Sequence, residues 1–319
     1  MPWSNDLVRR GLEALGIAAM VVPPAVADVA YVTCQTGDEV GIIDLTRGQE
    51  TMRWQVPGKP AGVAVSPGAV FSVSAESKVI RRMHPGSGEV MAETTLDGGP
   101  IGVVLDAPRD RLFVSDWYAA RIWVLAASDL SIERSLKVGA APAGVALSPD
   151  GRFLASAEKD ADQASVFDAE TLELLHRISV GTRPFGLSFG PDGRLYVANV
   201  GSHDVTVADP QTGEHIATVP VGERPYGVSF AKGRAFVTNQ YAGTISVIDT
   251  ETLEMLKTLT VGEYPEGIDT TQDGKRVVLA NWFDNTVTVV DAETLSVIET
   301  IETCDGPRAF GSFILGNWQ

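Results

Sequence analysis

The sequence is poor in the residues that most often carry catalytic or metal chemistry. It has two cysteines and four histidines in 319 residues, and His84, His176, His203 and His215 show no ligand spacing. It also lacks the C-x-x-C-H haem motif, paired C-x-x-C zinc motifs, the G-x-S-x-G nucleophile elbow and the G-x-G-x-x-G dinucleotide loop. We therefore assign no catalytic residue, no metal ligand and no cofactor from the sequence.

Positive charge and long apolar runs are also scarce. The chain carries 25 Lys and Arg against 41 Asp and Glu, a net charge of -16. This acidity argues against nucleic acid and anionic membrane surfaces as partners and favours a cationic or neutral one. No stretch is long and apolar enough to span a membrane. We expect neither nucleic-acid binding nor membrane insertion, and the oligomeric state stays open.

The N-terminal segment has the layout of a secretory signal peptide. Two arginines precede an apolar run over residues 11–22, and Ala25-Val26-Ala27 supplies an A-x-A cleavage site. The alternatives are an N-terminal helix and a retained anchor. We predict a signal peptide over residues 1–27, a single propeller domain over residues 28–319 and a periplasmic or secreted protein.

Most of the chain is a repeat with a period of 40 to 42 residues. One landmark is a proline before each apolar strand that contains a glycine. Another is the aspartate that ends a V-x-V-I-D strand. His84 and Ala126 replace this aspartate in two degenerate copies. The prolines are Pro60, Pro100, Pro142, Pro184, Pro225, Pro265 and Pro307. The aspartates are Asp44, Asp168, Asp209, Asp249 and Asp291. A period of this length is typical of propeller blades.

Each copy predicts four short strands. In residues 227–261, for example, runs of Val, Ile, Thr, Phe and Tyr alternate with Gly, Asn, Asp and Pro. The chain ends with one strand over residues 310–315 and begins with three over residues 29–56, so the two partial units complete one blade. We predict an all-β, seven-bladed β-propeller of four-stranded antiparallel blades. Pairing of the C-terminal strand with N-terminal strands closes the ring and removes the exposed edge.

The repeat register places the two cysteines close together. Cys34 ends the second strand of the closing blade, and Cys304 lies in the loop before its innermost strand. We predict a disulfide between them, which would stabilise the fold by roughly 5 kcal/mol, less any strain. The alternative is two unrelated thiols.

The connections between strands divide between the two faces of such a ring. The turns on one face are stereotyped S-P-D-G and D-x-E-T-L sequences with local backbone reasons to exist, so we interpret them as scaffold. The loops on the other face carry aromatics and arginines, which bury large area with little entropy loss and offer planar donors. We predict that ligand or partner binding uses Trp117, Tyr118, Arg183, Phe185, Arg224, Tyr226, Tyr241, Tyr264, Glu266, Trp282, Phe283 and Arg308.

These residues also have structural explanations. The asparagines that end second strands are expected to satisfy their own turns. The residue after each strand-one proline either packs around the channel or contacts a ligand. Arg183, Arg224 and Arg308 form either a ring that binds an anionic group or ion pairs with nearby glutamates.

Several motifs resemble those of the YVTN-repeat seven-bladed propellers. They are Y-V-A-N at Tyr196, F-V-T-N at Phe236 and the V-G-x-x-P-x-G linkers at Val180, Val221 and Val261. The resemblance covers residues 28–315 and implies an exported binding or scaffold protein. Some relatives are accessory to quinone-cofactor alcohol and amine dehydrogenases, in which the cofactor belongs to another chain.

We expect a non-enzymatic exported propeller that binds a protein partner or a small anionic ligand. The alternative is a metal-dependent, lactonase-type hydrolase with a divalent cation at the channel mouth. Convergence of Glu266, Asn199, Asn239 and a further carboxylate on one point would favour the enzyme, whereas arginines and aromatics would favour binding. A structural surface-layer module is a third possibility, which the single domain without a tandem linker disfavours.

Overall fold

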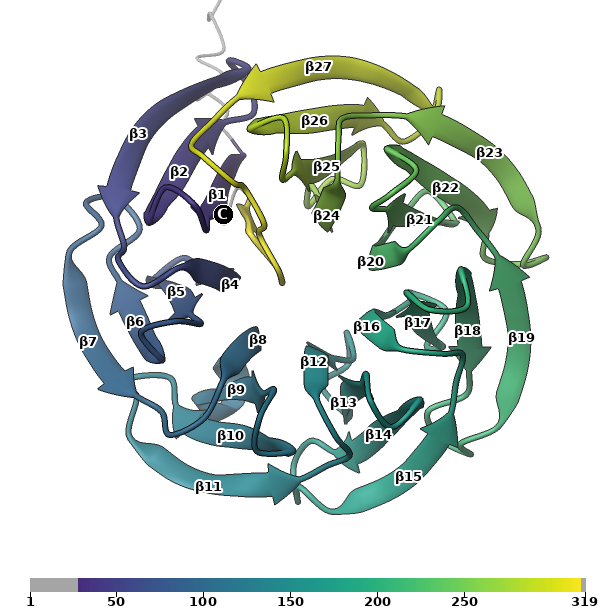
Figure 1. Ribbon diagram of the computed structural model, residues 1–319, viewed down its shortest axis with the longest axis horizontal. Helices are drawn as coiled ribbons and strands as arrows, with labels where there is room; N and C mark the ends of the chain where they lie inside the picture. Colours follow the sequence, from purple (N-terminus) through teal and green to yellow (C-terminus); the bar gives the residue numbers. More distant parts are fainter. Residues whose placement is uncertain (1–27, 317–319) are drawn as a thin grey trace, which may run out of the picture.

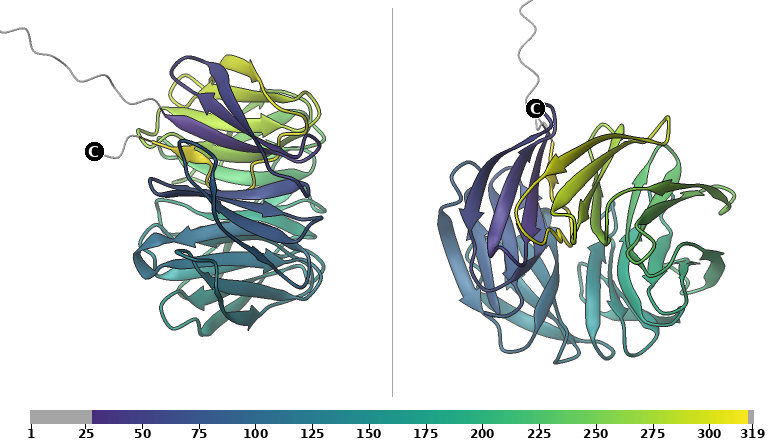
Figure 2. Two further views of the ribbon diagram at one scale, coloured as in Figure 1. Left: turned by 90° about the vertical axis from the view of Figure 1, so that its left-hand side faces the viewer. Right: turned by 45° about the horizontal axis from the view of Figure 1, so that its top comes forward.

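The computed structural model describes residues 28–316, which form seven four-stranded antiparallel sheets around one axis (Figure 1). From the side the ring is a thick disc (Figure 2). The regular elements of this part of the chain are strands, apart from the short 3-10 turn η1 (Ala107–Arg109). No helix within it is long and apolar enough to cross a membrane. The predicted seven-bladed propeller is confirmed, and the predicted signal peptide lies outside the described residues.

Each sheet is one blade whose strands follow one another from the axis to the rim. The six blades that are continuous in sequence are β4 (Pro60–Ser66), β5 (Ala69–Ser74), β6 (Val79–Met83) and β7 (Val90–Thr95); β8 (Pro100–Asp106), β9 (Arg111–Asp116), β10 (Arg121–Ala126) and β11 (Ile132–Lys137); β12 (Pro142–Leu147), β13 (Phe153–Glu158), β14 (Gln163–Asp168) and β15 (Leu174–Ser179); β16 (Pro184–Phe189), β17 (Leu195–Asn199), β18 (Asp204–Ala208) and β19 (His215–Pro220); β20 (Pro225–Ala231), β21 (Arg234–Asn239), β22 (Thr244–Asp249) and β23 (Met255–Thr260); β24 (Pro265–Thr270), β25 (Arg276–Asn281), β26 (Thr286–Asp291) and β27 (Ser296–Glu302). The closing blade is β28 (Ile314–Leu315), β1 (Val29–Cys34), β2 (Glu39–Asp44) and β3 (Gln49–Gln55).

The aspartate that ends most third strands holds the turn that follows it. Oδ1 of Asp249 accepts the backbone N–H of Glu251 at 2.9 Å and that of Thr252 at 2.8 Å. The same two turn positions are bound by Asp44, Asp168, Asp209 and Asp291. In a degenerate copy, Nδ1 of His84 accepts the N–H of Gly86 at 3.1 Å. The aspartate therefore recurs in the repeat because the backbone N–H groups of the following turn need an acceptor.

The blades approach most closely at the channel, where the innermost strands meet backbone to backbone. At one glycine per blade, an added Cβ would lie 2.0 to 2.9 Å from a backbone carbonyl oxygen of the next blade. A side chain does not fit at such distances, so only glycine allows this approach. The glycines are Gly62, Gly102, Gly144, Gly186, Gly227, Gly267 and Gly311. The last of them meets the carbonyl of Val63 in the first blade, so the series runs around the whole ring.

The closing blade is completed by both ends of the described chain, as predicted. β28 pairs antiparallel with the start of β1. Its regular pairing is shorter than the strand predicted over residues 310–315, because Phe310 instead bonds to the neighbouring blade. The N–H of Phe310 donates to the carbonyl of Ala61 at 3.1 Å, and its carbonyl accepts the N–H of Val63 at 2.9 Å. The C-terminal segment therefore joins both sides of the seam.

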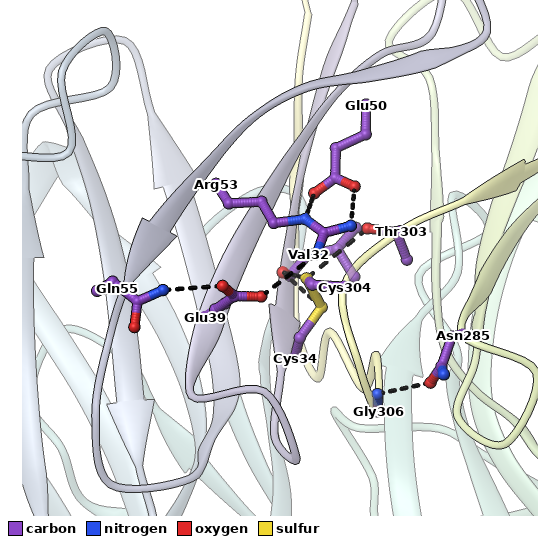
Figure 3. Close-up of polar contacts among 10 residues, drawn as sticks. All are labelled: Val32, Cys34, Glu39, Glu50, Arg53, Gln55, Asn285, Thr303, Cys304 and Gly306. Carbon is purple, nitrogen blue, oxygen red and sulfur yellow. Dashed lines mark hydrogen bonds and ion pairs between the residues drawn. A yellow bond between two sulfur atoms is a disulfide. The ribbon is translucent and has the colours of Figure 1, made fainter.

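Cys34 and Cys304 form the predicted disulfide, with their Cα atoms 5.7 Å apart (Figure 3). Both side chains are fully buried. The bridge ties the end of β1 to the loop that follows β27. Beside it, Arg53 forms an ion pair with Glu50 at 2.7 Å on the outer strand β3. The covalent link therefore holds the seam at which the ring closes.

We expect loss of this disulfide to lower the free energy of unfolding by about 5 kcal/mol, because the bridged residues are 270 positions apart and the bridge restricts the unfolded chain. Urea unfolding of oxidised wild type and of the Cys34→Ala/Cys304→Ala variant would measure the difference. Wild type reduced with a thiol is the control and should unfold with the variant. Equal midpoints for the oxidised wild type and the variant would show that the bridge does not hold the seam.

Candidate binding face

The predicted binding residues come from two kinds of loop that the fold brings together. The backbone N–H groups of Trp117, Tyr241 and Trp282, in loops after second strands, each donate to a carbonyl in the loop before a first strand, at 2.8, 3.3 and 3.0 Å. Both kinds of loop therefore lie on one face of the ring, which we call the aromatic face.

Four aromatic side chains close the channel at this face. We call them the mouth cluster: Trp117, Phe185, Tyr226 and Phe310. The ring of Phe185 lies at the centre, with centroid distances of 4.0 Å to Tyr226, 5.4 Å to Phe310 and 6.0 Å to Trp117. Phe185 is only 7% exposed. Of the two roles expected for the residue after the proline of a first strand, packing around the channel or contact with a ligand, Phe185 therefore has the packing role.

A buried ion pair lies beside the mouth cluster. Glu266 is fully buried, and its Oε2 lies 3.3 Å from Nη1 of Arg308. Gln240 donates from Nε2 to Oε1 of Glu266 at 2.6 Å. The guanidinium of Arg308 lies over the rings of Trp282 and Phe310, 4.9 and 5.5 Å from their centroids. Burial raises the pKa of Glu266 to about 7, although Arg308 and Gln240 oppose the rise.

A second group of aromatic residues forms a partly exposed strip over the blades β20 to β23 and β24 to β27. We call it the aromatic patch: Tyr241, Tyr264, Trp282 and Phe283. Neighbouring ring centroids in the patch lie 5.3 to 6.4 Å apart. Phe283 is 65% exposed and Tyr241 is 49% exposed. Tyr264 and Trp282 between them are half-buried, so the strip offers two exposed rings on an aromatic base to one side of the channel axis.

The remaining predicted residues lie around these two groups. The guanidinium of Arg224 stacks over Tyr241, 4.1 Å from the ring centroid. Within residues 28–316, neither Arg183 nor Arg224 forms an ion pair, whereas Arg308 pairs with Glu266. Tyr118 is 81% exposed, in a different blade from the patch. Of the three arginines, Arg308 therefore forms the ion pair with a nearby glutamate that was one of the two expectations.

The asparagines that end second strands satisfy their own hairpins. Nδ2 of Asn239 donates to two hydroxyls of its hairpin, both at 3.0 Å, and that of Asn281 likewise donates to two hydroxyls. Nδ2 of Asn199 donates to one hydroxyl, at 2.9 Å, and to the carboxylate of Asp204, at 2.7 Å. The metal-dependent alternative requires such side chains to converge with Glu266 on one ion. Over residues 28–316, no group of three or more His, Cys, Asp or Glu side chains could hold a metal ion. Oδ1 of Asn199 and Asn239 and Oε2 of Glu266 are buried without a hydrogen-bond partner among the described residues, so the metal-dependent alternative is decided by titration with divalent cations.

Sequence reasoning missed Gln240 and Lys159. Both follow directly after a second strand, the position that Trp117 and Trp282 occupy in other blades. Gln240 binds Glu266, and Nζ of Lys159 lies 4.6 Å from the ring centroid of Trp117. Alignment of the repeats could have predicted both residues, because it places them at the same position as Trp117 and Trp282.

Two protein-family models match parts of the sequence. The cytochrome D1 heme domain matches residues 192–308, and the seven-bladed β-propeller lactonase matches residues 126–230. Each match spans about a third of the chain. No curated protein sequence matches the chain significantly. These matches agree with the propeller architecture, and the narrower YVTN resemblance stays a prediction.

Solved structures share the fold at low sequence identity. Hydrazine synthase from Kuenenia stuttgartiensis is 18% identical with a TM-score of 0.73, over 82% of this chain and 91% of that chain. A functionally unknown protein from Desulfotomaculum acetoxidans is 14% identical with a TM-score of 0.75, over 90% of this chain and 98% of that chain. Such identities support the fold alone.

The haem in the name of one family model does not fit the residues of this channel. Phe185 and Tyr226, with centroids 4.0 Å apart, fill the mouth. The channel cavity is about 180 Å³, below the roughly 300–1,000 Å³ of typical ligand pockets. On the aromatic face, Nδ1 of His203 accepts the N–H of Arg224 at 3.1 Å. We therefore derive no haem chemistry for this chain.

The buried carboxyl of Glu266 predicts a pH dependence of stability. Its pKa is about 7 in the folded chain against an ordinary value of 4.5, so the folded state binds the proton more tightly. The resulting stabilisation is complete below about pH 4.5 and is lost as the pH rises through about 7. Between pH 5 and pH 8 we expect this effect to lower the free energy of unfolding of the wild type by about 2 kcal/mol. The Glu266→Gln variant should not show this fall, because an amide does not titrate. Urea unfolding at both pH values measures the difference. Parallel pH profiles for variant and wild type would contradict the expectation.

We expect divalent cations to leave the thermal stability of the full chain unchanged, since no three His, Cys, Asp or Glu side chains gather within residues 28–316 in a way that could hold a metal ion. The measurement is the melting midpoint after EDTA treatment, with calcium, magnesium, zinc or manganese added in turn. A rise of more than about 2 °C that EDTA reverses would instead favour the metal-dependent alternative, because a ligand that binds the folded state stabilises it.

Proposed function

We propose that this protein is a non-enzymatic binding or scaffold propeller that docks a protein partner on the aromatic patch. The observation that carries the proposal is the patch itself: the exposed rings of Tyr241 and Phe283 stand on the half-buried rings of Tyr264 and Trp282. Aromatic side chains dominate binding energy at protein interfaces, because they bury large area at small entropic cost.

The surroundings of the patch support a protein partner over a small anion. Arg308 is already paired with Glu266, and the guanidinium of Arg224 is stacked over the ring of Tyr241. The exposed carboxylates Glu223, Glu263 and Asp284 lie in the same loops as the patch. A partner that presents an apolar anchor flanked by basic groups would match both the patch and its acidic border. Because the patch lies off the channel axis, such a partner tolerates the degenerate blades elsewhere in the ring.

We further propose that the protein is exported and accessory to a quinone-cofactor dehydrogenase system. A buried disulfide between Cys34 and Cys304 supports export, because such bridges persist in oxidising compartments. The resemblance to YVTN-repeat propellers supports the accessory role.

A lactonase-type hydrolase is the second candidate, favoured by the family-model match over residues 126–230. The divalent-cation titration described above tests its metal dependence.

The docking proposal is tested with the full chain as bait in a cell-envelope extract of its own organism. We expect one protein to be retained in stoichiometric amount by wild type and to be lost with the Tyr241→Asp/Phe283→Asp variant, because charge at the patch prevents its burial. With that protein purified, we expect Phe283→Ala alone to weaken binding by about tenfold or more.

The matched control is Ile216→Asp/Ile298→Asp, which places the same charges on outer-strand residues that are 44% and 53% exposed. This bait should retain the partner as wild type does. Retention by the patch variant, or equal loss with both variants, would refute docking on the patch.

A further inference from the structure

A cavity of about 180 Å³ lies inside the central channel, beneath the mouth cluster. At about 30 Å³ per water molecule, it has room for about six waters or one small organic molecule. Its walls are mainly the glycine and aliphatic residues of the innermost strands. The rings of Phe185, Tyr226 and Phe310 border the cavity at the aromatic face.

The polar groups that line the cavity have one sign of charge. Two acidic residues, Glu266 and Asp269, line it together with Ser188, Ser229 and Ser312, whereas no Lys, Arg or His among the described residues does so. Arg308 neutralises Glu266 from the side of the aromatic face. Within residues 28–316, the carboxylate of Asp269 forms no ion pair, and the chain as a whole has a net charge of -16. Such a lining attracts cations and repels anions.

The carboxylate of Asp269 is held in a fixed orientation. Its Oδ2 accepts the backbone N–H of Phe313 at 2.8 Å and that of Ile314 at 3.0 Å, and its Oδ1 accepts that of Thr270 at 2.8 Å. Burial in the channel raises the pKa of Asp269 to about 6 despite these three bonds. Asp269 is half-buried, so a cation that enters the cavity would stabilise the ionised form of this carboxylate.

The two ends of the channel differ. At the aromatic face, the mouth cluster and the Glu266–Arg308 ion pair fill the opening. From there the C-terminal segment runs toward the opposite face, where Leu315 pairs with the first residue of β1. Gly311 and Ser312 on this segment are exposed, and both line the cavity. Access is therefore from the face opposite the aromatic patch.

We propose that the channel interior binds a small organic cation, an amine or quaternary ammonium ion, between the carboxylate of Asp269 and the rings of the mouth cluster. A carboxylate supplies the opposite charge, and aromatic faces attract cations through their quadrupole. The small volume excludes larger ligands. This site is separate from the aromatic patch, so it stands or fails independently of the docking proposal.

Isothermal titration calorimetry of the full chain at pH 7.5 and constant ionic strength tests the proposal with choline and ethanolamine as probes. We expect one site with a dissociation constant of about 1 mM or lower for at least one probe. The neutral isostere 3,3-dimethylbutan-1-ol should bind at least about tenfold more weakly than choline. No binding of either cation up to about 10 mM, or equal binding of the isostere, would overturn the proposal.

Two pairs of variants locate the bound cation. Ser188→Leu fills the cavity without changing any charge and should weaken binding by about tenfold or more, whereas the matched Ser188→Ala keeps the volume and should stay within about threefold of wild type. Asp269→Asn keeps an acceptor for the backbone of β28 and should weaken binding by about tenfold. If Asp269→Asn fails to fold, the Ser188 pair decides. Undiminished binding to Ser188→Leu would place the cation elsewhere and overturn the proposal.

Discussion

The close approach of backbones around the channel is the constraint on which the rest of the structure depends. Each blade brings a glycine against a carbonyl of the next blade, at a distance that leaves no room for a Cβ. Seven such contacts in series set the width of the channel. They also fix the residue that precedes these glycines in most blades, such as Phe185, Tyr226 or Glu266, at the mouth. The mouth is therefore built around these side chains, to which the loops add Trp117 against Phe185 and Arg308 against Glu266.

Much of the fold could be predicted from the sequence, because the requirements of a propeller are local and recur in every blade. The aspartate after each V-x-V-I strand recurs because it binds two N–H groups of the next turn. Blade number, the closing strand and the face that carries the aromatics follow from counting such positions. The length of β28 could not be predicted in this way. Phe310 pairs across the seam with Ala61 and Val63 instead of with β1, and no local pattern in the sequence indicates this change of partner.

The candidate site could be predicted only as a set of residues on one face. Its division into a packed mouth cluster and an exposed patch depends on distances between side chains of different blades. Phe185 and Phe310 are far apart in sequence and have ring centroids 5.4 Å apart. Glu266 and Arg308 occupy equivalent positions in adjacent blades, so the register makes them neighbours, but it does not say whether either binds a ligand. Burial decides this, because a fully buried carboxylate requires a partner within the protein.

The seam at the closing blade shows how one repeat position can serve a second purpose. In the blade that begins at β20, Asn239 ends the second strand beside Gly222, where an added Cβ would lie 2.6 Å from the asparagine side chain. Cys34 and Cys304 occupy the same two positions in the closing blade, so their side chains meet and form the bridge. Elsewhere the two positions belong to chain that is continuous through the blade, and a hydrogen-bonded turn is sufficient. At the seam they belong to opposite ends of the chain, where separation would open the ring, and a covalent bond at that point prevents it.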